Sequence, residues 1–147
     1  MIGSDQQPFD LIFDTGSSWL WVNSRLCEGC SSRQNKFNEK NSTTFSFYPA
    51  ILDLHYGSGD AYGYISFDQV CLNEDSCADN FAFLNVAAQS GLSGLDGSGI
   101  VGMSPQAPDQ GGYSYGDLFI TKMKDAGVID KAIFSIYAEL ENDNSKI

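Results

Sequence analysis

Two apolar strands joined by a tight turn that carries a carboxylate constrain the fold more than any other feature of this sequence. Residues 8–13 alternate apolar and polar side chains, which is the pattern of a half-buried strand. Trp19 to Val22 form a second apolar run. Asp14 lies in the turn of small, hydrogen-bonding residues between them, where a carboxylate is costly unless its neighbours bond to it. Positions of this kind are typically functional.

The rest of the chain is predicted to be mostly β, because short apolar stretches alternate with clusters of Gly, Ser and Asn. Residues 31–46 are polar and indicate a surface loop. Leu118 to Lys124 is the one segment with a helical pattern, capped by Asp117 and stopped by Gly127. The candidate strands lie around residues 9–13, 19–23, 51–56, 61–70, 81–87 and 133–138.

Length and charge narrow the function classes. The chain has 147 residues, which is enough for one domain with a core, and its formal net charge is -11. Nineteen acidic residues against eight basic ones argue against nucleic-acid binding, which needs a basic surface. No apolar run is long enough to predict a membrane-spanning helix. Low pH would relieve part of the negative self-repulsion, so the composition fits an acidic compartment.

Four cysteines form two close pairs in the sequence, Cys27 with Cys30 and Cys71 with Cys77. An even number of cysteines in short loops predicts two local disulfides in an oxidising compartment. A zinc site built from all four is the second interpretation, although the wider spacing of the later pair does not favour it. A thioredoxin-type redox role for the first pair is disfavoured because no helical pattern follows it. Asn41 begins an Asn-Ser-Thr sequon and is a candidate glycosylation site in keeping with secretory routing, although such tripeptides also occur by chance in polar loops.

Two further motifs do not predict the chemistry they superficially suggest. Gly97 to Gly102 formally matches the dinucleotide-binding pattern G-x-G-x-x-G. That pattern works only between a strand and a helix, whereas loop-like residues 90–96 precede it here and Pro105 and Pro108 follow. His55 is the only histidine, and without a G-x-S-x-G elbow it indicates a strand residue near the surface rather than a catalytic triad.

Four motifs in chain order resemble those of the pepsin-like aspartic proteases. Phe13 to Ser18, with the Trp-containing strand after it, is similar to their active-site loop, and His55 to Gly59 is similar to the tip of their flap hairpin. Gly99 to Gly102 resembles the hydrophobic-hydrophobic-Gly loop beneath the active site, and Phe134 to Tyr137 resembles the strand that closes the amino-terminal lobe. The resemblance implies a mostly β fold: a single pepsin-like lobe of partly closed, barrel-like sheets with one or two short helices.

The resemblance also implies how the chain is organised. Residues 1–138 would form the amino-terminal lobe of a bilobal protein, and residues 139–147 a polar tail leading toward a missing carboxyl-terminal lobe. A leader, a propeptide and the first strands would precede Met1 in a complete family member. We therefore expect the sequence to be truncated or fragmentary.

Residues around the turn acquire roles from the resemblance. Asp14 would be one of two catalytic aspartates. Thr15 and Gly16 would form hydrogen bonds to the second lobe, and Ser17 would bond the outer oxygen of the Asp14 carboxylate.

The flap and the strands beside the turn would form the substrate site. The Tyr56 hydroxyl is expected to bond Trp21. Ile12 and Ile100 would help to form apolar subsites. The residues implied to contact substrate are Ile12, Trp21, Tyr56, Gly57, Ser58 and Ile100.

Members of this family hydrolyse peptide bonds with a water activated between two aspartates, with no metal and no cofactor. No second Asp-Thr/Ser-Gly follows residue 16, so the second aspartate would come from a carboxyl-terminal lobe, and the isolated chain would be inactive. Pairing of two copies is the weaker option, because each carries a net charge of -11. The remaining aspartates, among them Asp53 and Asp60, indicate a solvated acidic surface.

The predicted function is therefore an aspartic endopeptidase lobe that acts on polypeptides with hydrophobic side chains beside the cut bond. Its expected location is the lysosome, an acidic vacuole or the cell exterior. The alternative is a catalytically inactive pepsin-like lobe that serves as a peptide-binding or inhibitory module, or a gene-model fragment.

Overall fold

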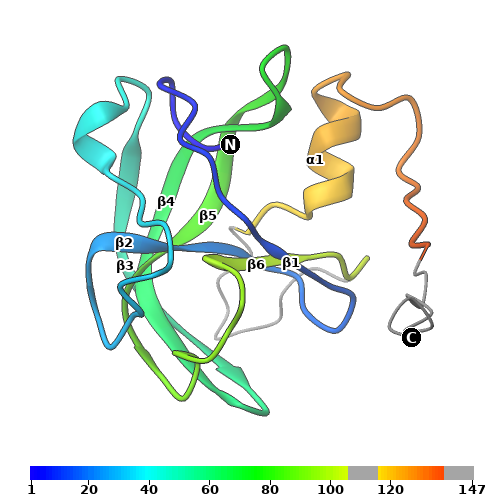
Figure 1. Cartoon of the computed structure of the whole chain (residues 1–147). Helices are drawn as coiled ribbons and strands as arrows, with labels where there is room; N and C mark the ends of the chain where they lie inside the picture. Colours follow the sequence, from blue (N-terminus) through cyan, green and yellow to red (C-terminus); the bar gives the residue numbers. More distant parts are fainter. Residues whose placement is uncertain (106–115, 138–147) are drawn as a thin grey trace, which may run out of the picture.

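The computed structural model describes residues 1–105 and 116–137, and its strands form one sheet (Figure 1). The strands are β1 (Ile12–Asp14), β2 (Leu20–Glu28), β3 (Ser46–Tyr56), β4 (Gly59–Asn73), β5 (Ser76–Ser90) and β6 (Gly99–Gly102). The short helices are the 3-10 helix η1 (Glu39–Asn41) and α1 (Phe119–Asp125).

The mostly β lobe is confirmed, but its sheet is open. Within the described residues the strand order is β1-β6-β2-β5-β4-β3, which leaves β1 and β3 at the two edges. A barrel would require these edge strands to pair with each other. In the part of the chain that the structure describes, the six strands therefore form one sheet that is not closed into a barrel.

Long antiparallel strands make up most of the sheet. β3, β4 and β5 follow one another as hairpins, with Gly57 and Ser58 at the first turn. In β3 the buried Leu52 and Leu54 alternate with exposed neighbours, which is the period of two that a half-buried strand requires. The predicted hairpin is confirmed, and its strands extend beyond the predicted bounds.

Parallel pairing assembles the strands around Asp14. β1 pairs in parallel with β6, β6 pairs antiparallel with β2, and β2 pairs in parallel with β5. Residues 99–102, expected to be a loop, are thus strand β6 and are buried at every position. A strand of four residues between two neighbours is too short to show alternation in the sequence.

The two faces of the sheet carry separate apolar clusters, which we call the helix-side core and the hairpin-side core. The buried residues of the helix-side core are Ile2, Leu20, Val22, Phe37, Val70, Ala78, Phe81, Phe83, Val101, Met103, Phe119 and Met123. Those of the hairpin-side core are Trp19, Trp21, Cys27, Leu52, Leu54, Ala61, Ile65, Leu84, Val86, Leu92 and Ile100. Successive residues of a strand point to opposite faces, so each central strand contributes to both cores.

Helix α1 packs against the helix-side core through its two buried residues, Phe119 and Met123. It ends as the sequence predicts. Gly127 has φ +74°, its N–H donates to the Lys124 carbonyl, and the Val128 N–H donates to the Met123 carbonyl. This pair of bonds satisfies carbonyls that the helix end would otherwise leave unpaired.

The start of α1 differs from the prediction. Leu118 occupies the N-cap position, and no side chain caps the helix there. The Asp117 carboxylate instead accepts a hydrogen bond of 2.9 Å from the Ala82 N–H and lies 3.2 Å from Lys122 Nζ. Asp117 therefore joins the helix to β5, so its expected capping role is wrong.

Two predicted strands are shortened or missing. Of residues 9–13, only the last two belong to β1. Residues 133–137 are irregular, with Ile136 65% and Tyr137 85% exposed, so the strand expected there is wrong for the described part of it. An apolar stretch forms a strand only where a neighbour accepts its backbone hydrogen bonds, and no described strand pairs with this segment. The polar tail at 139–147 lies outside the described residues.

Both predicted disulfides are present. Cys27 and Cys30 are bonded with their Cα atoms 5.7 Å apart. Cys71 and Cys77 lie opposite each other in β4 and β5 and are bonded with a Cα separation of 4.0 Å. Because all four sulfur atoms are paired with one another, the zinc interpretation is wrong.

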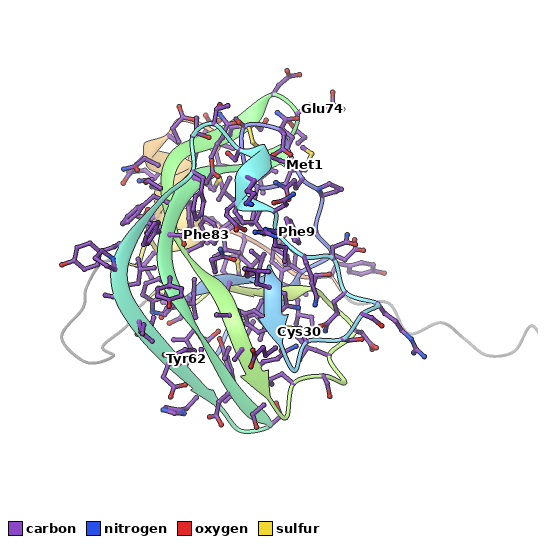
Figure 2. All side chains as sticks on the ribbon, turned by 90° about the vertical axis from the view of Figure 1, so that its left-hand side faces the viewer. Met1, Phe9, Cys30, Tyr62, Glu74 and Phe83 are labelled. Atoms are coloured by element: carbon purple, nitrogen blue, oxygen red, sulfur yellow. A yellow bond between two sulfur atoms is a disulfide. The ribbon has the colours of Figure 1, made fainter. Side chains whose placement is uncertain are left out.

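The first residues of the chain add to the sheet beside the end of β4. Ile2 forms an antiparallel bridge with Val70, and the amino group of Met1 donates to the Cys71 carbonyl at 2.8 Å. Figure 2 shows Met1 close to the β4–β5 turn that carries Glu74. Burial lowers the pKa of this amino group.

Candidate active site

Asp14 is the last residue of β1 and is half-buried at the start of the turn. Its Oδ1 accepts a hydrogen bond of 2.9 Å from the Gly16 N–H. Its backbone carbonyl accepts from the Met103 N–H at 2.7 Å, and the Ser17 carbonyl accepts from the Ser104 N–H at 2.9 Å. The turn is thus attached at two points to the residues that follow β6, which restricts the direction of the carboxylate.

The register of the sheet directs Asp14 toward the hairpin-side core. Ile12 lies opposite Ile100 in β6, and Ile100 lies opposite Trp21 in β2, so these three side chains share a face. Asp14 is two residues beyond Ile12 and therefore points to the same face.

A hydrogen bond ties the β3–β4 hairpin to the strands beside Asp14. Trp21 Nε1 donates to the Tyr56 hydroxyl at 2.9 Å, and the two ring centroids are 6.4 Å apart. This confirms the expected contact between them. Burial raises the pKa of Tyr56, the Trp21 and Ser17 groups lower it, and the negative charge of Asp14 raises it. The phenol therefore lies within electrostatic reach of the carboxylate.

Ser17 does not make its expected bond. Its Oγ is buried and meets no described group at hydrogen-bonding geometry, although it lies near enough to Tyr56 to affect the pKa of that phenol. The expected bond from Ser17 to the Asp14 carboxylate is therefore wrong for this structure. The turn folds back so that the Gly16 N–H, rather than the Ser17 hydroxyl, reaches the carboxylate.

Thr15 and Gly16 are exposed at the surface of the turn. Thr15 lines a cavity of about 250 Å³ together with residues that include Met103, Leu118 and Phe134. An exposed turn beside an open cavity is compatible with contact to another part of a larger protein. The hydrogen bonds from Thr15 and Gly16 to a second lobe stay a prediction.

The remaining predicted substrate residues lie in two kinds of environment. Gly57 and Ser58 are exposed at the hairpin tip, where their backbone groups are accessible. Ile12 is 37% exposed on the face of Asp14, whereas Ile100 is 6% exposed and belongs to the hairpin-side core. Direct contact of these residues with substrate stays a prediction.

Three backbone hydrogen bonds that hold the turn could not be recognised in the sequence. Met103 and Ser104 hold it through backbone N–H groups, which every residue except proline possesses. The Gly102 N–H donates to the Trp19 carbonyl at 3.0 Å, and only the run of glycines around it hints at a close approach of two backbones.

The arrangement can perform proton transfer. A carboxylate with one oxygen held by an N–H can accept a proton from a water molecule and pass it on. Among residues 1–105 and 116–137, no group of three or more His, Cys, Asp or Glu side chains could hold a metal ion. No helix in these ranges has both the length and the apolar character needed to cross a membrane.

Comparison with known proteins finds similarity along the whole chain. A family model described as "Eukaryotic aspartyl protease" matches residues 1–147. Plasmepsin IV of Plasmodium falciparum (isolate 3D7) is 32% identical over 142 residues, which cover 92% of this chain and 30% of the relative. Pepsin A of Sus scrofa is 31% identical over 149 residues, covering 99% and 38%. Gastricsin of Oryctolagus cuniculus is 32% identical over 141 residues, covering 92% and 35%. The chain thus spans about a third of the length of these relatives.

Proposed function

We propose that this chain, which belongs to the eukaryotic aspartyl protease family, forms the amino-terminal lobe of an aspartic endopeptidase. Asp14 would supply one of two catalytic carboxylates. The other would come from a carboxyl-terminal lobe, since no second Asp-Thr/Ser-Gly follows residue 16. The activity is proposed for the complete protein, because this chain spans about a third of the length of its relatives.

The proposed reaction is hydrolysis of a peptide bond by general acid–base catalysis. One ionised carboxylate takes a proton from a water molecule as the water attacks the carbonyl carbon, while the other, protonated, donates to the carbonyl oxygen. Two like charges so close cannot both stay ionised, as is established for aspartic-protease dyads. The proton belongs to the pair, so Asp14 can take either role at different points of the cycle.

The location of Asp14 in a fixed turn, on the face of the sheet to which the β3–β4 hairpin is bonded, is the observation that carries this proposal. The Gly16 N–H holds one carboxylate oxygen, and the bond from Trp21 to Tyr56 draws the hairpin toward the same face. A peptide between turn and hairpin could accept backbone hydrogen bonds from the exposed tip at residues 57–58. A hairpin with no relation to Asp14 would not need that bond.

A substrate class and a compartment can also be proposed from the residues of this chain. We infer a polypeptide substrate with apolar side chains next to the cut bond, because the partly exposed Ile12 shares the face of Asp14. Two disulfides and a net charge of -11 favour passage through an oxidising compartment to the lysosome, an acidic vacuole or the exterior. The proposed chemistry involves no metal and no cofactor, and its partner is the carboxyl-terminal lobe.

A protease assay of the complete gene product, at acid pH on an unstructured protein, tests the proposal. Asp14→Asn keeps the size of the side chain but removes the acid, and we expect a loss of turnover of at least about 100-fold. Asp10→Asn is the matched control, since Asp10 is exposed on the approach to β1 and lacks the Thr-Gly context. Activity that survives Asp14→Asn refutes the assignment.

A peptide inhibitor that mimics the tetrahedral intermediate separates the enzyme from the alternative. It should bind the complete gene product and block turnover. Binding of the inhibitor to a wild-type protein that shows no turnover contradicts the endopeptidase and favours an inactive peptide-binding lobe.

A further inference from the structure

His55 lies between two carboxylates on the outer face of the β3–β4 hairpin. Its Nδ1 is 2.7 Å from Asp60 Oδ1, and its Nε2 is 3.8 Å from Asp53 Oδ2. His55 and Asp60 are directly opposite each other in the ladder, next to the Tyr56–Gly59 pair at the hairpin tip. Asp53 is two residues earlier on β3 and so shares this face. One imidazole therefore contacts both strands of the hairpin.

No other cation pairs with these carboxylates in the part of the chain that the structure describes, because the lysine and arginine ion pairs lie elsewhere. Among residues 1–105 and 116–137, the ionisable groups that face His55 are Asp53 on its own strand and Asp60 on β4. Tyr62, opposite Asp53, is the next polar side chain, and Figure 2 shows it on the outside of β4. Ser90 of β5, opposite Asp60, does not titrate.

We propose that His55 is a positioning residue of the hairpin, acting through Asp60 and Asp53 as a pH-dependent clasp between the two strands. In the charged state, the imidazolium donates to Asp60 and attracts Asp53. In the neutral state, two carboxylates stand without a compensating charge on one face of a chain whose net charge is -11. Loss of the proton therefore loosens the tip of the hairpin.

The clasp reaches the candidate active site through Tyr56. Tyr56 follows His55 directly, so its side chain points to the opposite face, where its hydroxyl accepts the bond from Trp21. A tip that opens draws Tyr56 away from Trp21 and from Asp14. This last step rests on the proposed function, because only a bound peptide requires a closed hairpin.

The direction of the pH effect follows from the pairing. The hydrogen bond to Asp60 first, and the charge of Asp53 next, raise the pKa of His55 above its usual value of 6.5. A pKa raised in the folded state gives a contribution that is complete below 6.5 and disappears as the pH rises through the folded-state value. We therefore expect a closed hairpin in mildly acidic solution and a looser one above that range.

The titration of His55 itself tests the pairing. His55 is the only histidine, so one imidazole resonance in the NMR spectrum of this chain reports its protonation without ambiguity. Asp60→Asn should move the midpoint down toward 6.5. Asp75→Asn, which removes an equal charge from the β4–β5 turn, is the matched control and should leave the midpoint close to that of the wild type. An unchanged midpoint in Asp60→Asn overturns the pairing.

Amide hydrogen exchange of residues 54–61 tests the clasp. After correction for intrinsic rates, protection should fall roughly two- to fivefold as the pH rises through the His55 midpoint, which is the range typical of exposed ion pairs. His55→Gln should remove this dependence and give equal protection at both ends of the range. A fall that persists in His55→Gln, or that is absent from the wild type, overturns the proposal.

The clasp and the proposed function can fail separately. Neither the titration nor the exchange experiment requires proteolysis. An inactive protein with pH-dependent protection would retain the clasp and lose the protease assignment. An active enzyme with pH-independent protection would retain the protease assignment and lose the clasp.

Discussion

Replacing Gly102 by alanine should displace the turn that carries Asp14. Gly102 lies opposite Asp14 in the β1–β6 ladder. A Cβ atom at this position would lie 2.4 Å from the Ser18 carbonyl carbon and 2.5 Å from the Trp19 amide nitrogen. Non-bonded heavy atoms pack at about 3.5 Å or more, so the two backbones would have to separate by roughly 1 Å.

The expected loss of stability depends on the atoms that the new methyl group would contact. Both contacts are backbone atoms, which cannot rotate away as the end of a flexible side chain can. Overpacking of a tight interior costs about 1–3 kcal/mol, and we expect the upper end of that range here. For a domain of this length, about 3 kcal/mol corresponds to a fall in Tm of roughly 6–12 °C.

Thermal unfolding followed by tryptophan fluorescence would measure this loss, because Trp19 and Trp21 are both buried. Gly94→Ala is the matched control. Its added Cβ would meet nothing within 4 Å, so its free energy of unfolding should stay within about 0.5 kcal/mol of the wild type. Equal Tm values for Gly102→Ala and Gly94→Ala would refute the argument from close backbone approach.

Three further variants test other contacts. Tyr56→Phe leaves the buried Trp21 N–H without this acceptor and should lower the free energy of unfolding, measured in urea, by about 1–3 kcal/mol. An equal loss in a Trp21→Phe background would show that the bond is not responsible. Replacing both Cys71 and Cys77 by serine opens a short loop and should cost about 2 kcal/mol by the same method, and an unchanged midpoint contradicts this. Secretory expression should attach a glycan to Asn41, which is exposed at the end of η1; intact masses of the wild type and Asn41→Gln that show no glycan refute it.

Alternation in the sequence predicted the hairpin correctly because its strands are half-buried. Leu52 and Leu54 are buried between exposed residues of β3, so the pattern and the packing coincide. The short apolar stretch at residues 133–137 also predicted a strand, which does not form. A side-chain pattern identifies a face to be covered, but the backbone also needs a neighbouring strand, and that depends on segments far away in the sequence.

The candidate site likewise contains contacts that could be predicted from the sequence and contacts that could not. The carboxylate turn and the pair formed by Trp21 and Tyr56 could be predicted, because side chains carry them and the family resemblance supplies their partners. The contact of His55 with Asp60 could not, since it depends on a ladder register that places them opposite each other. A two-residue turn after Tyr56 fixes that register. The contact could therefore have been predicted only if the length of the turn had been known.

Trp21 connects the two restraints on the candidate active site. Its strand pairs with β6, which holds the Asp14 turn, while its indole N–H holds Tyr56. A shift of β6 caused by Gly102→Ala should therefore reach the hairpin through Trp21, so that Tyr56→Phe costs less in that background than in the wild type. His55 is linked to Trp21 through Tyr56, so its substitution should not add independently to Tyr56→Phe. Additive effects of Gly102→Ala and Tyr56→Phe would mean that the turn and the hairpin are held separately.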